Sequence, residues 1–133
     1  MTDPVLSHLL QHQADFVAHL GTFVAAPSVS TDPAYAEGMA EARRFLMARL
    51  NTLGFRDARE IAAGGHPAVT AHWHGAGPEA PTLLIYGHYD VQPPDPLDAW
   101  VTPPFTLSRR DGRLHARGVS DDKGPMLLAV ETL

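Results

Sequence analysis

Two short polar motifs in this chain carry residue types that bind metal ions. His88 and Asp90 follow directly after an apolar run at residues 82–86, so an imidazole and a carboxylate stand together after a predicted strand. If the strand continues, their side chains project to the same side, because neighbouring strand residues alternate between faces. Asp121 and Asp122 come later, before a predicted helix. Zinc binds imidazole and carboxylate groups in proteins, so the two motifs suggest the metal site of a hydrolase.

The predicted surroundings of these residues suit a metal centre. Open α/β sheets bind ligands at the carboxyl ends of their strands, where His88 and Asp90 are expected. A metal-binding histidine usually has its other ring nitrogen held by a carboxylate or carbonyl, and Asp90 is the candidate for that role, although spacing does not show which nitrogen it contacts. The dipole at a helix N-terminus favours the ionised form of Asp121 and Asp122, which suits hard ligands. In two-metal hydrolases a bridging carboxylate can hold ions about 3.5–4 Å apart.

Each histidine or aspartate motif also has an ordinary structural explanation when it is taken alone. A lone His-x-Asp is common at strand ends, and Ser-Asp-Asp before a helix can be only an N-cap. His72 and His74 fit an exposed strand edge, while His8 and His12 fit a solvated helix face. The chain has no cysteine, which excludes thiolate metal sites, and no Gly-x-Ser-x-Gly nucleophile motif.

Composition excludes several classes of protein. A length of 133 residues, with 44% hydrophobic and 19% charged residues, fits one modest globular domain. The formal charge of −5 argues against nucleic-acid binding, which relies on clustered lysine and arginine. No lysine or arginine precedes Arg43, so we expect neither a secretory signal nor a transit peptide, and the apolar runs are short for a membrane span. We therefore expect a soluble cytoplasmic protein without nucleic-acid or membrane partners.

The elements that position the polar motifs are predicted to form an α/β fold. Apolar residues at three- to four-residue spacing predict helices at residues 5–25 and 35–53, with Pro27 ending the first and Gly54 capping the second. Strand patterns occupy residues 59–62, 68–74, 82–86, 105–108 and 113–116. The continuous apolar run at 82–86 predicts a strand buried on both faces.

The remaining segments connect these elements. The proline-rich stretch at residues 93–104 predicts an ordered loop, and Asp111-Gly112 predicts the turn of a β-hairpin. Residues 126–133 have a helical pattern without a terminal cap, so we expect the chain to be incomplete at its C-terminus. An incomplete sheet exposes an unpaired edge, which predicts self-association of the isolated 133 residues.

Longer stretches of sequence combine these motifs in order. They are Pro27-Ser28-Val29-Ser30, Gly87-His88-Tyr89-Asp90-Val91-Gln92-Pro93, Asp98-Ala99-Trp100 with Pro104-Phe105, Asp111-Gly112-Arg113-Leu114, and Arg117-Gly118-Val119-Ser120-Asp121-Asp122-Lys123-Gly124. Together they cover most of the chain and resemble the carnosinase and bacterial dipeptidase family of di-zinc metallopeptidases, relatives of aminoacylase and glutamate carboxypeptidase. The resemblance implies that residues 1–133 form the N-terminal part of a zinc-exopeptidase-like catalytic domain, an α/β fold whose sheet is flanked by helices.

The resemblance also implies a role for each site residue. His88 would bind one zinc ion, Asp90 would act in catalysis by orienting His88, and Asp121 would bridge two zinc ions, with a cis peptide bond to Asp122. The family's downstream Glu-Glu pair, which supplies the general base and a ligand, has no counterpart in these residues, and Glu131 stands in the wrong context to replace it. A further acidic ligand, a late histidine and a lid or dimerisation domain are also absent. We therefore expect the 133 residues alone to be inactive and the full-length protein to be a homodimer.

The activity implied by the resemblance is zinc-dependent hydrolysis of dipeptides or short peptides. Two zinc ions would polarise the scissile carbonyl and lower the pKa of a bound water, while a glutamate moves its proton. Val91-Gln92-Pro93 together with Asp-Asp-Lys-Gly favours dipeptidases over deacylases of the succinyl-diaminopimelate desuccinylase type. Two alternatives remain open: an amidohydrolase acting on N-acyl amino acids, and a truncated, non-catalytic binding module or pseudoenzyme.

Overall fold

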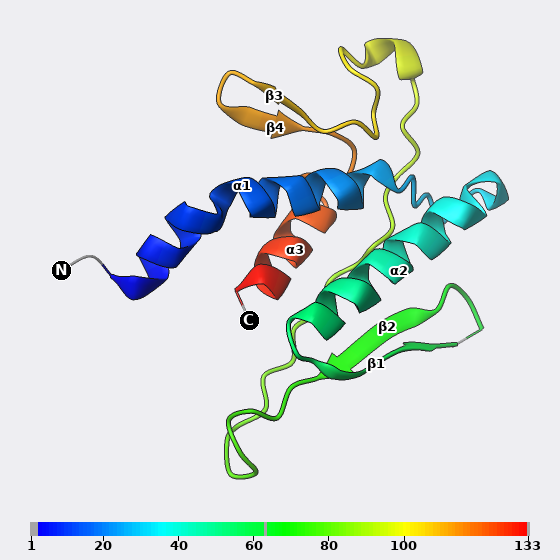
Figure 1. Cartoon of the computed structure of the whole chain (residues 1–133). Helices are drawn as coiled ribbons and strands as arrows, with labels where there is room; N and C mark the ends of the chain where they lie inside the picture. The colour runs from blue at the N-terminus through cyan, green and yellow to red at the C-terminus, as the bar shows by residue number, and fades with distance from the viewer. Residues whose placement is uncertain (1–2, 63, 133) are drawn as a thin grey trace.

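Helices α1 (Pro4–Ala25), α2 (Ala36–Thr52) and α3 (Lys123–Glu131) dominate the structure, a computed structural model that describes residues 3–62 and 64–132 (Figure 1). The last residue of the helix predicted at 126–133 lies outside this description. The Asp3 carboxylate accepts a hydrogen bond from the Val5 amide at 2.8 Å and caps α1. Gly54 caps α2 as predicted, because its amide and the next one bond back to carbonyls of the last turn at 3.1 and 3.0 Å.

Two small antiparallel sheets contain the strands of the described residues. Strand β1 (Arg56–Ile61) pairs with β2 (Ala68–His72), and β3 (Ser108–Arg110) pairs with β4 (Arg113–His115). The β3–β4 turn consists of Asp111 and Gly112, whose φ angles of 50° and 73° are those of a type I′ hairpin turn. The predicted Asp-Gly turn is therefore confirmed, but the first strand of the hairpin is Ser108–Arg110 rather than the predicted residues 105–108. Two short 3-10 turns, η1 (Pro33–Tyr35) and η2 (Leu97–Ala99), lie in the connections.

The apolar run at residues 82–86 does not form the predicted buried strand. Its side chains are exposed, with 80% of Leu83, 87% of Leu84 and 86% of Tyr86 accessible to solvent. Extended backbone becomes a strand only when a neighbour satisfies its amides and carbonyls, and no strand in the described part of the chain pairs with these residues. The prediction of burial on both faces is wrong for this reason.

The hydrophobic core lies where the three helices meet. Its buried members are Phe23, Ala26, Ala42, Leu46 and Leu127. The Phe23 ring stacks on that of Phe45, with centroids 4.8 Å apart. Helix α2 also contacts β1 and β2, and α1 contacts α3 (Figure 1). None of the described helices meets the length and apolarity that crossing a membrane requires.

Candidate metal centre

His88 lies between two carboxylates. Its Nδ1 is 3.0 Å from Asp90 Oδ1, and its Nε2 is 3.0 Å from Asp121 Oδ1. The imidazole is partly exposed at 40%, and the Asp121 side chain is 80% exposed. The structure therefore brings together the residues that the sequence singled out, and it shows that Asp90 contacts Nδ1 while Nε2 is directed at Asp121.

The protonation of His88 follows from these contacts. Burial lowers the pKa of His88, but the hydrogen bonds to Asp121 and Asp90 outweigh burial, so the pKa is raised above its usual value. A carboxylate can only accept, so each of these contacts favours an N–H on the facing ring nitrogen. The same pair of carboxylates that holds the proton would attract a divalent cation.

The peptide bond between Asp121 and Asp122 is cis, as the resemblance implied. Asp122 stands at the N-cap of α3, but its side chain makes no capping hydrogen bond. Its Oδ2 instead accepts the backbone amide of His88 at 3.1 Å. A Cβ atom on Gly87 would lie 3.0 Å from this oxygen, so glycine allows the close approach of the two segments. An N-cap alone does not account for the Ser-Asp-Asp motif.

The connector after α1 supports the segment that carries His88. Ser28 Oγ donates to Tyr89 O at 2.6 Å, and the Val91 amide donates to Ser28 O at 2.8 Å. Ser30 Oγ donates to Asp90 Oδ2 at 2.5 Å. The motif match included these serines, but sequence reasoning assigned them no role, because nothing local marks a contact with residues so far along the chain.

Lys123 joins the Asp121-Asp122 motif to the end of α1. Its side chain is fully buried, and Nζ donates to Phe23 O at 2.9 Å and to Ala26 O at 2.6 Å. These carbonyls lie at the C-terminal end of α1, where the helix dipole favours a cation. Burial lowers the pKa of Lys123 to about 7, while the carboxylates of Asp90 and Glu41 act in the opposite direction. Sequence reasoning did not identify this contact.

The proline-rich loop is ordered by a tryptophan and an arginine. Trp100 Nε1 donates to Pro94 O at 2.6 Å, and Arg117 Nη2 donates to Pro93 O at 3.1 Å. The Arg117 guanidinium also lies 5.2 Å from the Trp100 ring centroid, within the range of a cation–π contact. The loop that follows the His88 segment is therefore fixed to the segment that precedes Asp121, as the prediction of an ordered loop requires.

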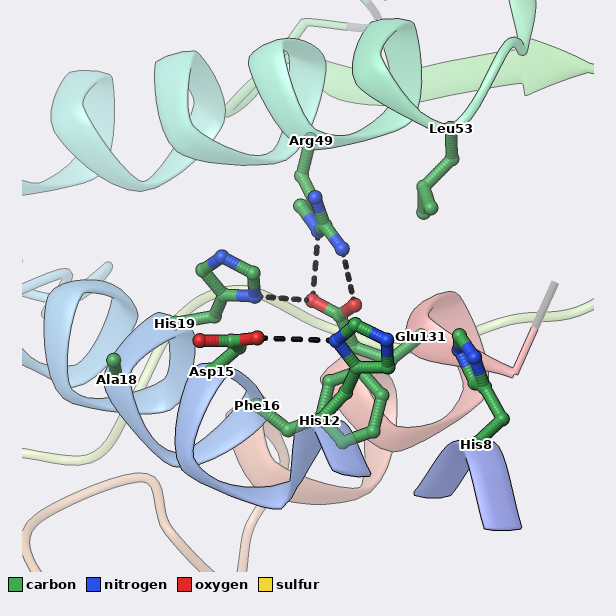
Figure 2. Close-up of a pocket in the computed structure, with 9 residues that line it drawn as sticks. All are labelled: His8, His12, Asp15, Phe16, Ala18, His19, Arg49, Leu53 and Glu131. Carbon is green, nitrogen blue, oxygen red and sulfur yellow. Dashed lines mark hydrogen bonds and ion pairs between the residues drawn. The ribbon is translucent and has the colours of Figure 1, made fainter. Parts of the chain in front are cut away.

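A pocket of about 440 Å³ lies apart from His88, and its lining includes neither His88 nor Asp121 (Figure 2). Glu131 projects into it, where its carboxylate accepts hydrogen bonds from Arg49 and contacts His19 Nδ1 at 3.0 Å. His8 and His12 also line this pocket, so the solvated helix face expected for them is only part of their surroundings. Glu131 connects α1, α2 and α3 through an ion pair.

The donors at His88 fit a divalent metal ion in kind but not in number. His88 Nε2 and Asp121 Oδ1 face each other next to solvent, and nitrogen and carboxylate oxygen are ligands of zinc. Within the described residues, no three histidine, aspartate or glutamate side chains are gathered to hold a metal ion. Zinc usually takes four ligands, so this pair is part of a site.

Comparisons with curated proteins identify similar chains. The family model for peptidase family M20/M25/M40 matches residues 84–133. A Cys-Gly metallodipeptidase of Candida albicans is 34% identical over 137 residues, covering 93% of this chain and 28% of the relative. A mouse Beta-Ala-His dipeptidase is 34% identical, covering 92% of this chain and 27% of the relative. A Xylella fastidiosa succinyl-diaminopimelate desuccinylase is 37% identical over 107 residues, covering 80% and 26% respectively.

Solved structures show the same relationship. The Saccharomyces cerevisiae dipeptidase Dug1p superposes with a TM-score of 0.85 at 28% identity, covering 95% of this chain and 29% of that one. Human carnosine dipeptidase 1 superposes with a TM-score of 0.84 at 32% identity, covering 96% of this chain and 29% of that one. The chain thus spans less than a third of the length of these relatives. The motif order, the family match at residues 84–133 and the superpositions agree that this chain is similar to members of peptidase family M20/M25/M40.

Proposed function

We propose that residues 1–133 are the N-terminal part of the catalytic domain of a zinc-dependent dipeptidase. The observation that carries this proposal is the placement of His88, whose Nδ1 meets Asp90 and whose Nε2 meets Asp121, each at 3.0 Å. In carboxylate–histidine metal sites one ring nitrogen is held by a carboxylate and the other binds the metal, and here Nε2 faces Asp121, which could share such a metal as a second ligand. The relatives' names, metallodipeptidase and dipeptidase, support the reaction class.

Each residue has a distinct part in the proposed site. His88 and Asp121 would hold zinc, with Asp121 as the bridging ligand if two ions bind, and Asp90 would keep Nδ1–H occupied so that Nε2 is free to coordinate. Bound zinc would polarise a scissile carbonyl and acidify a water. Asp122 holds the His88 backbone, which keeps the imidazole close to Asp121. The general base and the remaining ligands would come from residues other than those described.

Unblocked dipeptides or short peptides are the proposed substrates. We further propose that the whole protein is a cytoplasmic homodimer without nucleic-acid or membrane partners; the net charge of −5 agrees with the lack of a nucleic-acid surface. A second candidate, hydrolysis of N-acyl amino acids, is favoured by one observation: the match to a succinyl-diaminopimelate desuccinylase at 37% identity.

Hydrolysis of two alternative substrates tests the proposal. The complete protein would be loaded with zinc and supplied separately with an unblocked dipeptide and with an N-succinyl amino acid. We expect hydrolysis of the dipeptide, its loss after chelation with recovery on zinc addition, and no activity in His88→Ala. Preference for the N-succinyl substrate would favour the deacylase. A folded, zinc-loaded protein that hydrolyses neither would be the non-catalytic module, and residues 1–133 alone should hydrolyse neither substrate.

A further inference from the structure

We propose that Ser30 is a positioning residue for the metal centre, because it fixes the carboxylate that orients His88. This inference rests on the proposed function for its consequence, although the contact itself is independent of it. Asp90 is held at both oxygens: Oδ1 lies 3.0 Å from His88 Nδ1, and Oδ2 accepts the Ser30 hydroxyl at 2.5 Å. A carboxylate bound at both oxygens cannot rotate without losing one contact. Ser30 therefore acts on His88 through Asp90.

The chemistry of the Ser30 hydroxyl suits this task. A hydroxyl is a neutral donor, so it fixes Asp90 without cancelling the negative charge that stabilises the Nδ1–H of His88. An ammonium or guanidinium at the same place would pair with that charge and weaken its effect on the imidazole. The nearby cation, Lys123 Nζ, donates instead to the carbonyls of Phe23, in α1, and of Ala26, the residue that follows this helix. The serine thus restricts the geometry of Asp90 while leaving its charge available.

The backbone around Ser30 is itself fixed on both sides. Val29 is fully buried and forms a parallel bridge with Val91, next to Asp90. The carbonyl of Ser30 lies 2.9 Å from His66 Nε2. Because the connector is bound to the His88 segment by its backbone, the Ser30 hydroxyl has a defined position relative to Asp90. Ser28, two residues earlier, binds a backbone carbonyl instead, so only Ser30 of the two contacts a site carboxylate.

The first test measures the ring tautomer of His88 by nitrogen-15 NMR in the full chain, at a pH where the imidazole is neutral. His88→Gln identifies the resonance. We expect the Nδ1–H tautomer to dominate in the wild type, because Nδ1 faces both the carboxylate and the backbone carbonyl of Asp90 whereas Nε2 faces Asp121 alone. Ser30→Ala should shift the population towards the Nε2–H tautomer, and Ser30→Thr, which keeps the hydroxyl, should restore the wild-type population. Thr31→Ala, which changes an exposed neighbour, is the control and should resemble the wild type. An unchanged tautomer in a folded Ser30→Ala protein would overturn the proposal.

The second test measures zinc affinity in the complete protein. Loss of a group that supports a metal ligand typically weakens binding 10- to 100-fold, and we expect about a tenfold loss in Ser30→Ala. In a protein that already carries Asp90→Ala, Ser30→Ala should cause little further loss of zinc affinity, because Ser30 acts on His88 only through the Asp90 carboxylate. Full additivity would overturn the proposal. If the wild type binds no zinc but the tautomer still shifts, the proposed function fails while the role of Ser30 stands.

Discussion

His88 and His19 each contact a carboxylate at 3.0 Å, yet their surroundings differ in charge and exposure. His19 faces Glu131, whose side chain is only 5% exposed and is also bound by Arg49 (Figure 2). His88 faces Asp90 and Asp121 beside solvent, with no arginine contacting either carboxylate among the described ion pairs. Glu131 is buried and paired with an arginine, whereas Asp90 and Asp121 are more exposed and their negative charges are opposed in part only by the buried Lys123.

The difference separates a structural histidine from a candidate metal ligand. Arginine stays charged, so the Arg49 guanidinium satisfies Glu131 permanently and joins two helices. The hydrogen bond to Glu131 in turn raises the pKa of Arg49. An excess of carboxylate next to solvent instead favours binding of a cation. A histidine beside an acid is therefore informative only when the rest of the charge around it is counted.

The largest expected effect distinguishes the two histidines directly. His88→Gln should lower the zinc affinity of the complete protein by about 100-fold or more, because it removes a proposed ligand rather than a supporting group. His19→Gln should leave that affinity unchanged, since His19 lies in the separate pocket. Isothermal titration of both variants measures the contrast. Equal losses in the two variants would show that the charge comparison does not identify the metal centre.

Removing the arginine of the closed cluster should cost stability instead. Arg49→Met leaves a buried carboxylate without its cation, and we expect a loss of about 3 kcal/mol in the free energy of unfolding. Arg44→Met is the matched control on the same helix, because Arg44 and Glu37 are 57% and 74% exposed. That variant should change stability by less than about 1 kcal/mol. Urea unfolding checks both values, and similar losses would argue against a structural role for Glu131.

The buried lysine gives a smaller but separate effect. Lys123→Met would remove the Lys123 donor from the carbonyls of Phe23 and Ala26, leaving Ala26 O with the Ser28 amide alone, at a cost of about 2 kcal/mol. Because Lys123 follows the Asp121-Asp122 motif, zinc affinity should fall as well. Thermal unfolding and zinc titration of the same sample measure the two changes. A drop in stability with zinc affinity intact would mean that the end of α1 and the metal centre are independent.

The smallest effect on stability is expected in the exposed apolar run. Leu84 is 87% exposed, so Leu84→Lys should change the unfolding free energy of the isolated 133 residues by no more than about 0.5 kcal/mol. It should nevertheless reduce the self-association that we expect of these residues, because lysine blocks pairing at an open edge. Sedimentation velocity at increasing concentration tests this. A wild-type chain that stays monomeric throughout would contradict the expectation.

Local signals in the sequence were enough to predict the helices, the Asp-Gly turn and the polar motif that contains His88, whereas the pairing of His88 with Asp121 was implied by the family resemblance. Their causes lie within a few residues: the spacing of apolar side chains, the turn chemistry of Asp111-Gly112, and a polar motif after an apolar run. The contacts that hold the site together were not predictable in this way. Ser30 and Lys123 reach partners 60 and 97 to 100 residues away, which no local pattern encodes.

The apolar run at 82–86 shows the opposite limit. Its apolar composition predicted burial, but burial depends on a neighbouring strand, and the described residues supply none. The pattern of apolar residues indicates which secondary structure and which degree of burial a segment favours. Whether the preference is met depends on the rest of the fold.

The exposed run has a mechanical consequence for the metal centre. Only Gly87 separates Tyr86 from His88, so any contact that fixes the run also fixes the direction in which the chain enters the metal centre. On its other side His88 is already held through Asp90 and Asp122. A strand that pairs with residues 82–86 would then restrict the position of His88 without contacting its imidazole. Metal affinity should therefore rise when such a strand is present.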